Sequence, residues 1–302
     1  MATPASDFSP EVRASAWWSG DSRKAADGRA SEAILIKLGL LDPPDLSGNE
    51  AVQMGHVMEP VILGLAQQRL GAEVRKIDHA YVHQREPWLR SHFDGLAVVD
   101  GKEVLIEAKN YGAHQRSKFD ADNGVVPAAD YAQCLHEATV FGTDTVYLAV
   151  LLGGQEFCFT KLTFSDEQKE EFIKQMAVYW GMVASKTPPE PSTPDEARVV
   201  WPVSQKAVVE ASRALEEAVA KLKDASANRK AWETREDELK VLVQQAMQEK
   251  DTLVDISGKV LATWKSAAAS RKFDAKLFQQ AMPDIYEKFV VEVQGPRRFL
   301  TK

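Results

Sequence analysis

Alternating apolar and polar positions mark two short strands early in the chain, at residues 94–99 and 104–109. An Asp-Gly pair separates them, and such a pair between two alternating stretches is typical of a tight β-hairpin turn. Because side chains alternate with a period of two, Glu107 and Lys109 share one face of the second strand. The pattern therefore predicts an antiparallel hairpin that carries an acid and a base side by side.

Other segments before residue 186 show either helical or strand periodicity. Apolar residues at helical spacing predict helices at residues 31–39, with Ser31 as the capping residue, and at 49–70, 127–142 and 165–184. Apolar runs predict strands at residues 74–82, 147–152 and 156–162. Pro60 lies inside the second helix, and since proline removes a backbone donor it should kink that helix or mark its restart. These patterns predict a first domain over residues 1–186.

Four prolines in the stretch TPPEPSTP, residues 187–194, mark the clearest boundary and predict a Pro-rich linker at 187–203. Residues 204–250 then show helical apolar spacing, interrupted near residues 226–228. This pattern predicts two helices in an antiparallel hairpin or coiled-coil arm. A small α+β piece follows, so we expect a separate C-terminal part at 204–302.

The distribution of charge differs between the two parts. The 302 residues carry 37 Lys+Arg and 44 Asp+Glu, a net charge of −7. Residues 1–197 hold 18 basic and 29 acidic residues, a net of −11, and residues 198–302 hold 19 and 15, a net of +4. An acidic body that binds polyphosphate would need local cations, a metal ion, or the basic C-terminal part.

The remaining composition is that of an ordinary globular protein, with 44% hydrophobic residues. No run approaches the roughly 20 apolar residues of a membrane helix, and the first ten residues lack the features of a signal peptide, so we expect a cytoplasmic protein. Cys134 and Cys158 lie in apolar stretches without neighbouring metal ligands, which predicts buried packing residues. The six histidines are scattered and predict no site by themselves.

The hairpin also places candidate chemistry in one region. Asp94 needs only to lie across from Glu107 for the two carboxylates to hold a hard divalent cation such as Mg²⁺. Lys109 beside that ion could orient or deprotonate a bound water. The alternative is a solvated hairpin on which Glu107 and Lys109 form a surface charge pair.

Asp94, Glu107 and Lys109 together resemble the PD-(D/E)xK nuclease motif, and the flanking residues narrow the resemblance to the YqaJ-like viral recombinase family. The resemblance covers roughly residues 15 to 180. It implies an α/β fold with a restriction-endonuclease-like core, in which helices flank a mixed central sheet. Phe93 departs from the family pattern, in which a proline often precedes the aspartate.

The same resemblance implies roles for further residues. Asp94, Glu107 and the Ala108 carbonyl would hold Mg²⁺, which Mn²⁺ can replace. Glu59, in a G-x-x-x-E pattern on the predicted helix 49–70, would position a second ion. Gln133 matches a helix glutamine near the catalytic lysine, although a glutamine on an amphipathic helix is otherwise simply exposed.

Contacts with DNA are expected outside this cluster. Arg23 and Ser31 match a family pattern loosely and could bind a phosphate at a helix start; alternatively they are a solvated arginine and a capping serine. Arg116 and Lys118, in the polar loop after the hairpin, could contact DNA, as could Tyr131 on the following helix. Solvated side chains are the alternative for the loop.

The resemblance implies a Mg²⁺-dependent phage or prophage exonuclease in a bacterial host. It would digest double-stranded DNA ends, 5′ to 3′, and leave single strands for recombination by annealing. The resemblance also implies a homotrimer around the DNA and a single-strand annealing protein as partner. Two alternatives remain: a structure-selective or restriction-type endonuclease, and a non-catalytic DNA-binding adaptor.

Overall fold

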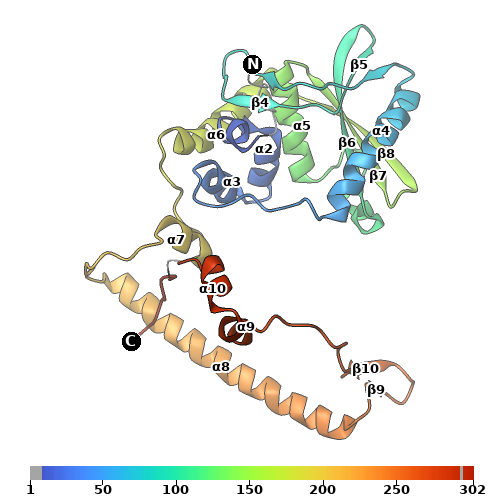
Figure 1. Cartoon of the computed structure of the whole chain (residues 1–302). Coiled ribbons are helices and arrows are strands. Elements are labelled where there is room, and N and C mark those ends of the chain that lie inside the picture. The colour runs from blue at the N-terminus through green and yellow to red at the C-terminus, as the bar shows by residue number, and fades with distance from the viewer. Residues whose placement is uncertain (1–8, 293–294) are drawn as a thin grey trace. The chain divides into compact units, whose positions relative to one another are not determined.

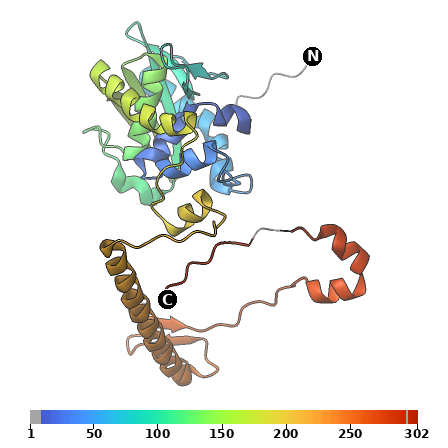
Figure 2. The ribbon, with the colours of Figure 1, turned by 90° about the vertical axis from the view of Figure 1, so that its left-hand side faces the viewer.

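The computed structural model describes residues 9–292 and 295–302 (Figures 1 and 2). The chain divides into two compact units, Met1–Trp201 and Pro202–Lys302. We refer to them as the N-terminal unit and the C-terminal unit.

A five-stranded mixed sheet forms the centre of the N-terminal unit, in the order β2-β5-β6-β7-β8. Its strands are β2 (Val74–Arg75), β5 (Gly95–Val99), β6 (Lys102–Tyr111), β7 (Thr145–Leu152) and β8 (Glu156–Thr163). β6 pairs antiparallel with β5 and parallel with β7, and β8 returns antiparallel. The predicted hairpin is confirmed, and both residues of its Asp100-Gly101 turn have a positive φ, as a primed two-residue turn requires.

A second, small sheet joins segments that are far apart in sequence. β1 (Trp17–Trp18) pairs parallel with β4 (Leu89–Ser91), and β3 (Tyr81–Val82) pairs with β4 on its other side. The single strand predicted at residues 74–82 is therefore wrong, because β2 and β3 belong to different sheets. The chain leaves the central sheet after Arg75, and the polar segment 76–80 connects the two.

Helices cover both faces of the central sheet. α4 (Glu50–Leu70) packs Ile62 and Leu63 against one face, where Ile106 and Ala149 point. α5 (Ala128–Phe141) covers the other face, and α6 (Asp166–Ala184) packs against α5. Three shorter helices complete the N-terminal part: α1 (Pro10–Ala14), α2 (Ser19–Ala26) and α3 (Ala30–Lys37). The predicted α/β fold with a mixed, helix-flanked sheet is confirmed.

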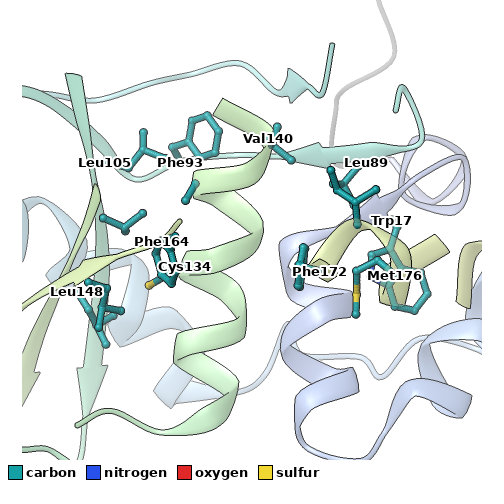
Figure 3. Packing of buried hydrophobic residues seen from close by; sticks show 14 of the residues in the cluster. Trp17, Leu89, Phe93, Leu105, Cys134, Val140, Leu148, Phe164, Phe172 and Met176 are labelled. Carbon is teal, nitrogen blue, oxygen red and sulfur yellow. The ribbon is translucent and has the colours of Figure 1, made fainter. Parts of the chain in front are cut away.

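The larger hydrophobic cluster lies on the α5 side of the sheet (Figure 3). Leu105 and Leu148 of the sheet pack near Cys134 of α5, while Trp17 lies close to Met176 of α6. Cys134 and Cys158 are both buried and free, which confirms their prediction as packing residues.

Two details of the predicted helices differ in the structure. α4 continues through Pro60, and Val57 and Val61 near this proline are at least half exposed. α3 begins at Ala30 after Arg29, so Ser31 lies inside the first turn and is not the capping residue. Pro60 lies at an exposed position, and α4 continues there without the backbone hydrogen bond that proline cannot donate.

The N-terminal unit ends with α7 (Pro194–Val200), which Thr193 caps inside the predicted linker. The C-terminal unit is organised on α8 (Arg213–Met247), one helix of 35 residues. The predicted helical hairpin is therefore wrong. The segment Ser226-Ala227-Asn228 contains neither glycine nor proline, and its residues cost only a few tenths of a kcal/mol each in a helix. The pair of Arg229 with Glu233 lies directly after the expected break, inside the same helix.

The rest of the C-terminal unit consists of short strands and short helices, as the predicted small α+β piece requires. β9 (Thr252–Val254) and β10 (Val260–Thr263) form an antiparallel hairpin. α9 (Ala275–Ala281), α10 (Pro283–Tyr286) and the 3₁₀ turn η2 (Glu287–Phe289) follow. Among the described residues, no helix has the length and apolar character needed to cross a membrane.

Candidate active site

A pocket of about 410 Å³ opens where β5 begins and β6 ends, beside α4 and α5. Five of its lining residues are those whose side chains the sequence singles out as metal ligands or catalytic groups. Ala108, whose carbonyl is a further expected ligand, also lines the pocket. The lining residues are Arg13, Ser19, Val52, Gly55, His56, Glu59, His92, Asp94, Glu107, Ala108, Lys109, Asn110 and Gln133.

Asp94 stands immediately before β5, where the pairing with β6 begins. Its carboxylate accepts a hydrogen bond from the Ala108 amide at 2.8 Å, which fixes it against the end of β6. Phe93, in the place of the family's proline, is buried and its ring lies 4.9 Å from that of Tyr81. A packed aromatic ring therefore anchors the aspartate in this chain.

Glu107 and Lys109 lie on the face of β6 that is turned toward α5. The side chain of Glu107 is 3% exposed and that of Lys109 is 19% exposed, and the two form an ion pair. The Gln133 amide donates to Glu107 at 2.5 Å. The structure thus brings together the three residues of the motif and rules out a solvated surface pair.

The carboxylates in this pocket repel one another. Burial, and then the charge of Glu107, raise the pKa of Asp94 well above its usual range. Burial lowers the pKa of Lys109, but the charges of Glu107 and Asp94 outweigh burial and raise it above the ordinary value. Lys109 is therefore held as a cation that neutralises part of the cluster.

Glu59 reaches the same pocket from α4. Its carboxylate lies 2.8 Å from the ammonium of Lys76, whose side chain is 57% exposed. Its negative charge contributes to the raised pKa of Asp94. The structure thus brings Glu59 to the cluster, where its carboxylate pairs with the exposed Lys76.

Gln133 connects the sheet to a second buried acid on α5. Its side-chain amide nitrogen donates to Glu107 and also, at 3.0 Å, to Glu137 one helical turn further on. Burial, followed by the charge of Glu107, raises the pKa of Glu137 well above its usual range. Gln133 is buried rather than exposed, and Glu137 is a residue of the site that sequence reasoning missed. The signal was a glutamate inside an apolar helical stretch.

Arg23 lies behind the pocket rather than on its lining. Its guanidinium pairs with the buried Asp130, donates to the Tyr111 hydroxyl at 2.9 Å, and lies 3.4 Å from the Gln133 side-chain oxygen. Its side chain is 30% exposed. Ser31 is on α3 and does not line the pocket.

The other expected DNA contacts are placed elsewhere. Arg116 pairs with Glu156 and donates to the Phe119 carbonyl at 2.7 Å, in the 3₁₀ helix η1 (Ala113–Lys118). Lys118 is exposed at the end of η1. Tyr131 accepts from Gln168 at 3.2 Å and packs edge-on against Phe164. None of these three lines the pocket, so their contact with DNA stays a prediction.

Sequence reasoning also missed several lining residues, among them Arg13 and His92. The Arg13 guanidinium lies 4.8 Å from the centre of the Trp18 ring, and His92 stacks on that ring from β4's side. Both line the pocket. The pairing of β1 with β4 brings them together, and no local pattern in either segment announces that pairing.

The donor set fits a divalent cation held by few protein ligands. Within residues 9–292 and 295–302, no three His, Cys, Asp or Glu side chains converge on one point. Asp94 and Glu107 nevertheless provide hard oxygen ligands, and Mg²⁺ characteristically takes one or two carboxylates and keeps several waters. A cation between them would offset both effects that raise the pKa of Asp94, its burial and the charge of Glu107. A role for Glu59 would require it to leave Lys76.

The mixed sheet presents Asp94 before one strand and Glu-x-Lys along its neighbour, which is the arrangement expected from the sequence's resemblance to the PD-(D/E)xK nuclease motif. Residues 19–145 match the family model of the YqaJ-like viral recombinase domain. The chain is 24% identical over 276 residues to the uncharacterized protein YqaJ of Bacillus subtilis (strain 168), covering 89% of this chain and 84% of that protein.

Solved structures of two bacterial exonucleases are also similar to the chain. The alkaline exonuclease LHK-Exo from Laribacter hongkongensis shares 14% identity with a TM-score of 0.47, over 58% of this chain and 91% of that one. A phage-related exonuclease from Haemophilus somnus 129PT shares 14% identity with a TM-score of 0.39, over 54% of this chain and 82% of that one. Each likeness covers little more than half of the present chain.

Proposed function

We propose that this protein is a divalent-metal-dependent DNA exonuclease that digests double-stranded ends from 5′ to 3′ and leaves single strands for recombination by annealing. The observation that carries the proposal is the convergence of Asp94, Glu107 and Lys109 on one pocket, with two carboxylates whose repulsion calls for a cation. The match of residues 19–145 to the YqaJ-like viral recombinase domain supports the same class of activity.

Asp94, Glu107 and the Ala108 carbonyl would hold the ion. This ion would be Mg²⁺, which Mn²⁺ could replace. When bound, the ion lowers the pKa of its water and offsets charge that develops on the phosphate. Gln133 fixes the Glu107 carboxylate by a hydrogen bond to Oε1, the oxygen with which Lys109 also pairs. Glu59 would serve a second ion once Lys76 releases its carboxylate.

The role of Lys109 follows from its charge. An ammonium group has three donors, and the ion pair with Glu107 uses one of them. The others can orient a water or a phosphate oxygen in the pocket. Because Glu107 and Asp94 raise the pKa of Lys109, it acts here as a cation and donor, and it becomes a base only if that pairing weakens.

Arg23 would anchor the phosphate at the 5′ end of the DNA. Its position beside Gln133 is held by Asp130 and Tyr111, and a guanidinium binds phosphate through two parallel hydrogen bonds. We expect linear duplex with a 5′-phosphate to be digested faster than the same duplex with a 5′-hydroxyl. Arg23→Ala should remove most of this difference, whereas Arg29→Ala, at an exposed arginine on α3's N-terminal side, should keep it.

The choice between exonuclease and endonuclease is tested with closed circular duplex. The proposal expects linear duplex to be degraded and the circle to remain intact. Nicking or linearisation of the circle would favour the structure-selective or restriction-type endonuclease, and no cleavage of either substrate would favour the adaptor. Equal digestion of the phosphorylated and hydroxyl ends would remove the anchoring role from Arg23. The trimer and the annealing partner remain expectations from the family.

A further inference from the structure

The long helix α8 exposes an unusual number of large apolar side chains. Figure 1 shows α8 as one uninterrupted helix. Leu222 is 44% exposed, Leu239 is 49% exposed and Trp232 is 74% exposed. The two halves that the sequence pattern pairs in a hairpin lie end to end in this helix, so folding back within the chain does not bury them.

These residues follow a heptad repeat along the whole of α8. Eight of the ten a and d positions are apolar, which is the pattern of a coiled-coil seam. The a positions are Leu215, Leu222, Arg229, Glu236 and Val243, and the d positions are Ala218, Ala225, Trp232, Leu239 and Ala246.

The two polar positions distinguish the direction of pairing. In a parallel, in-register pair, Arg229 would face Arg229 and Glu236 would face Glu236, and each like-charge pair is unfavourable. In an antiparallel pair, a positions meet d positions. Leu222 then lies opposite Leu239, and Arg229 lies opposite Trp232, where a cation–π contact can form.

This antiparallel register also uses the full length of the helix. The two-fold axis passes between residues 230 and 231, next to the midpoint of Arg213–Met247. All ten seam positions of one copy then face seam positions of the other, over about 50 Å at 1.5 Å per residue. A register that matches the seam and the helix ends together is self-complementary.

A groove at one end of α8 fits the same partner. An apolar pocket of about 400 Å³ lies between the C-terminal half of α8 and β10, lined in part by Leu239, Val243 and Trp264. Trp264 is 48% exposed. In the antiparallel register, the segment at this level in the second copy carries Leu215 and Leu222. Each copy therefore offers both the apolar knobs and the groove that receives them.

We propose that α8 joins two copies of this chain as an antiparallel coiled coil. The partner is a second copy because the seam and the groove complement themselves about a two-fold axis. This association belongs to the C-terminal unit and does not depend on the nuclease activity. It is also separate from any trimer of the N-terminal unit, because its contacts lie wholly within residues 213–264.

Disulfide formation between full-length chains tests the pairing. Leu222→Cys and Leu239→Cys lie opposite each other only in the antiparallel register, and within one helix they are 17 residues, about 26 Å, apart. Under mild oxidation, a mixture of the two variants should give a cross-linked dimer on a denaturing gel, and each variant alone should give at least tenfold less. The unmodified chain is the background control, since Cys134 and Cys158 are buried.

A matched control uses the outer face of the same helices. Residues 227 and 234 of the two copies lie at the same level in this register, but their side chains point away from the seam. A mixture of Ala227→Cys and Thr234→Cys should therefore give no cross-linked dimer. Cross-linking of Leu222→Cys with itself would show parallel pairing. A monomeric internal disulfide in the Leu222→Cys, Leu239→Cys double variant would show a hairpin. Either result, or no cross-link above the Ala227→Cys and Thr234→Cys mixture, would overturn the proposal.

Discussion

Buried polar side chains on α5 connect the candidate active site to the rest of the N-terminal unit. Gln133 and Glu137 face Glu107 on the sheet, Asp130 holds Arg23, and His136 holds α2 and β4. Each of these contacts joins α5 to a segment distant in sequence. Only Gln133 could be singled out beforehand, by resemblance, because burial of the others depends on how α2 and the small sheet pack on α5.

His136 should make stability depend on pH. Its Nδ1 accepts from the Ser22 hydroxyl at 2.8 Å and its Nε2 donates to the Arg90 carbonyl at 2.9 Å. Burial lowers the pKa of His136 to about 3 from an ordinary 6.5. Below pH 6.5 the imidazole of His136 is protonated in the unfolded chain but stays neutral in the folded chain. This difference lowers the free energy of unfolding by about 1.4 kcal/mol for each unit that the pH falls, down to about pH 3.

Chemical denaturation of the unmodified protein and of His136→Gln, between pH 7 and 4, measures this contribution. The variant should be less stable at pH 7 by roughly 1–3 kcal/mol, because buried hydrogen bonds are lost. It should also lose stability more slowly as the pH falls. Buried acids with raised pKa values act in both proteins and cancel in the comparison. Parallel stability curves would contradict the assignment to His136.

At the scale of elements, local patterns predicted those parts of the fold that local chemistry determines. The hairpin of β5 and β6, with its Asp-Gly turn, was predicted correctly, as were helices α4, α5 and α6. The patterns failed where pairing with a distant segment decides the outcome. The sequence predicts one strand over β2 and β3 because no signal in it shows that they belong to different sheets.

The prediction for α8 failed for a local reason, and not because of a distant pairing. Its apolar spacing correctly predicts helix, but the weak interruption at residues 226–228 predicts a turn that the structure does not have. Without glycine or proline the helix simply continues. The site shows the same division: the spacing of Glu107 and Lys109 is local, whereas the burial of Glu137 and the pairing of Glu59 with Lys76 are tertiary.

Gly95 allows α4 and β2 to approach the strand that follows Asp94. A Cβ at this position would lie 2.8 Å from Val74 Cγ1 and 3.1 Å from Leu63 Cδ2, closer than packed side chains come. We therefore expect Gly95→Ala to destabilise the N-terminal unit by about 1–3 kcal/mol through overpacking. It should also lower nuclease activity, because α4 carries Glu59 to the pocket.

Gly64→Ala provides the matched control for this change. Gly64 is exposed on α4, with open space at its Cβ position, so alanine should stabilise the helix by about 0.5–1 kcal/mol. Thermal melting of both variants gives the comparison. A Gly95→Ala protein as stable as the unmodified chain would show that the close approach of α4 and β2 is not required.

At the scale of the whole molecule, stability of the N-terminal unit should not require the C-terminal unit. Both hydrophobic clusters around the central sheet consist of residues before 184, with partly buried neighbours in the same range. A chain ending at Trp201 should therefore remain soluble and unfold cooperatively, with a midpoint near that of the corresponding transition in the full chain. Calorimetry of the two proteins makes the comparison.

The shortened chain should also bind duplex DNA more weakly and with a shallower salt dependence, since residues 198–302 carry the net positive charge. Binding measured at several salt concentrations gives the slope. An insoluble product would contradict the independence of the N-terminal unit. An unchanged affinity and slope would show that the basic C-terminal part does not contact DNA.

The central claim is that Asp94 and Glu107 hold a metal ion for DNA cleavage, and digestion of linear duplex with and without Mg²⁺ tests it most directly. We expect degradation only with the ion, and a loss of roughly a thousandfold or more in Asp94→Asn, since such an ion supplies several kcal/mol. The melting temperature of Asp94→Asn without metal should not fall, because the raised pKa of Asp94 shows that its charge is unfavourable there. Asp45→Asn, at an exposed loop acid, should digest at the unmodified rate. Digestion in the presence of a chelator, or undiminished digestion by Asp94→Asn, would contradict the account.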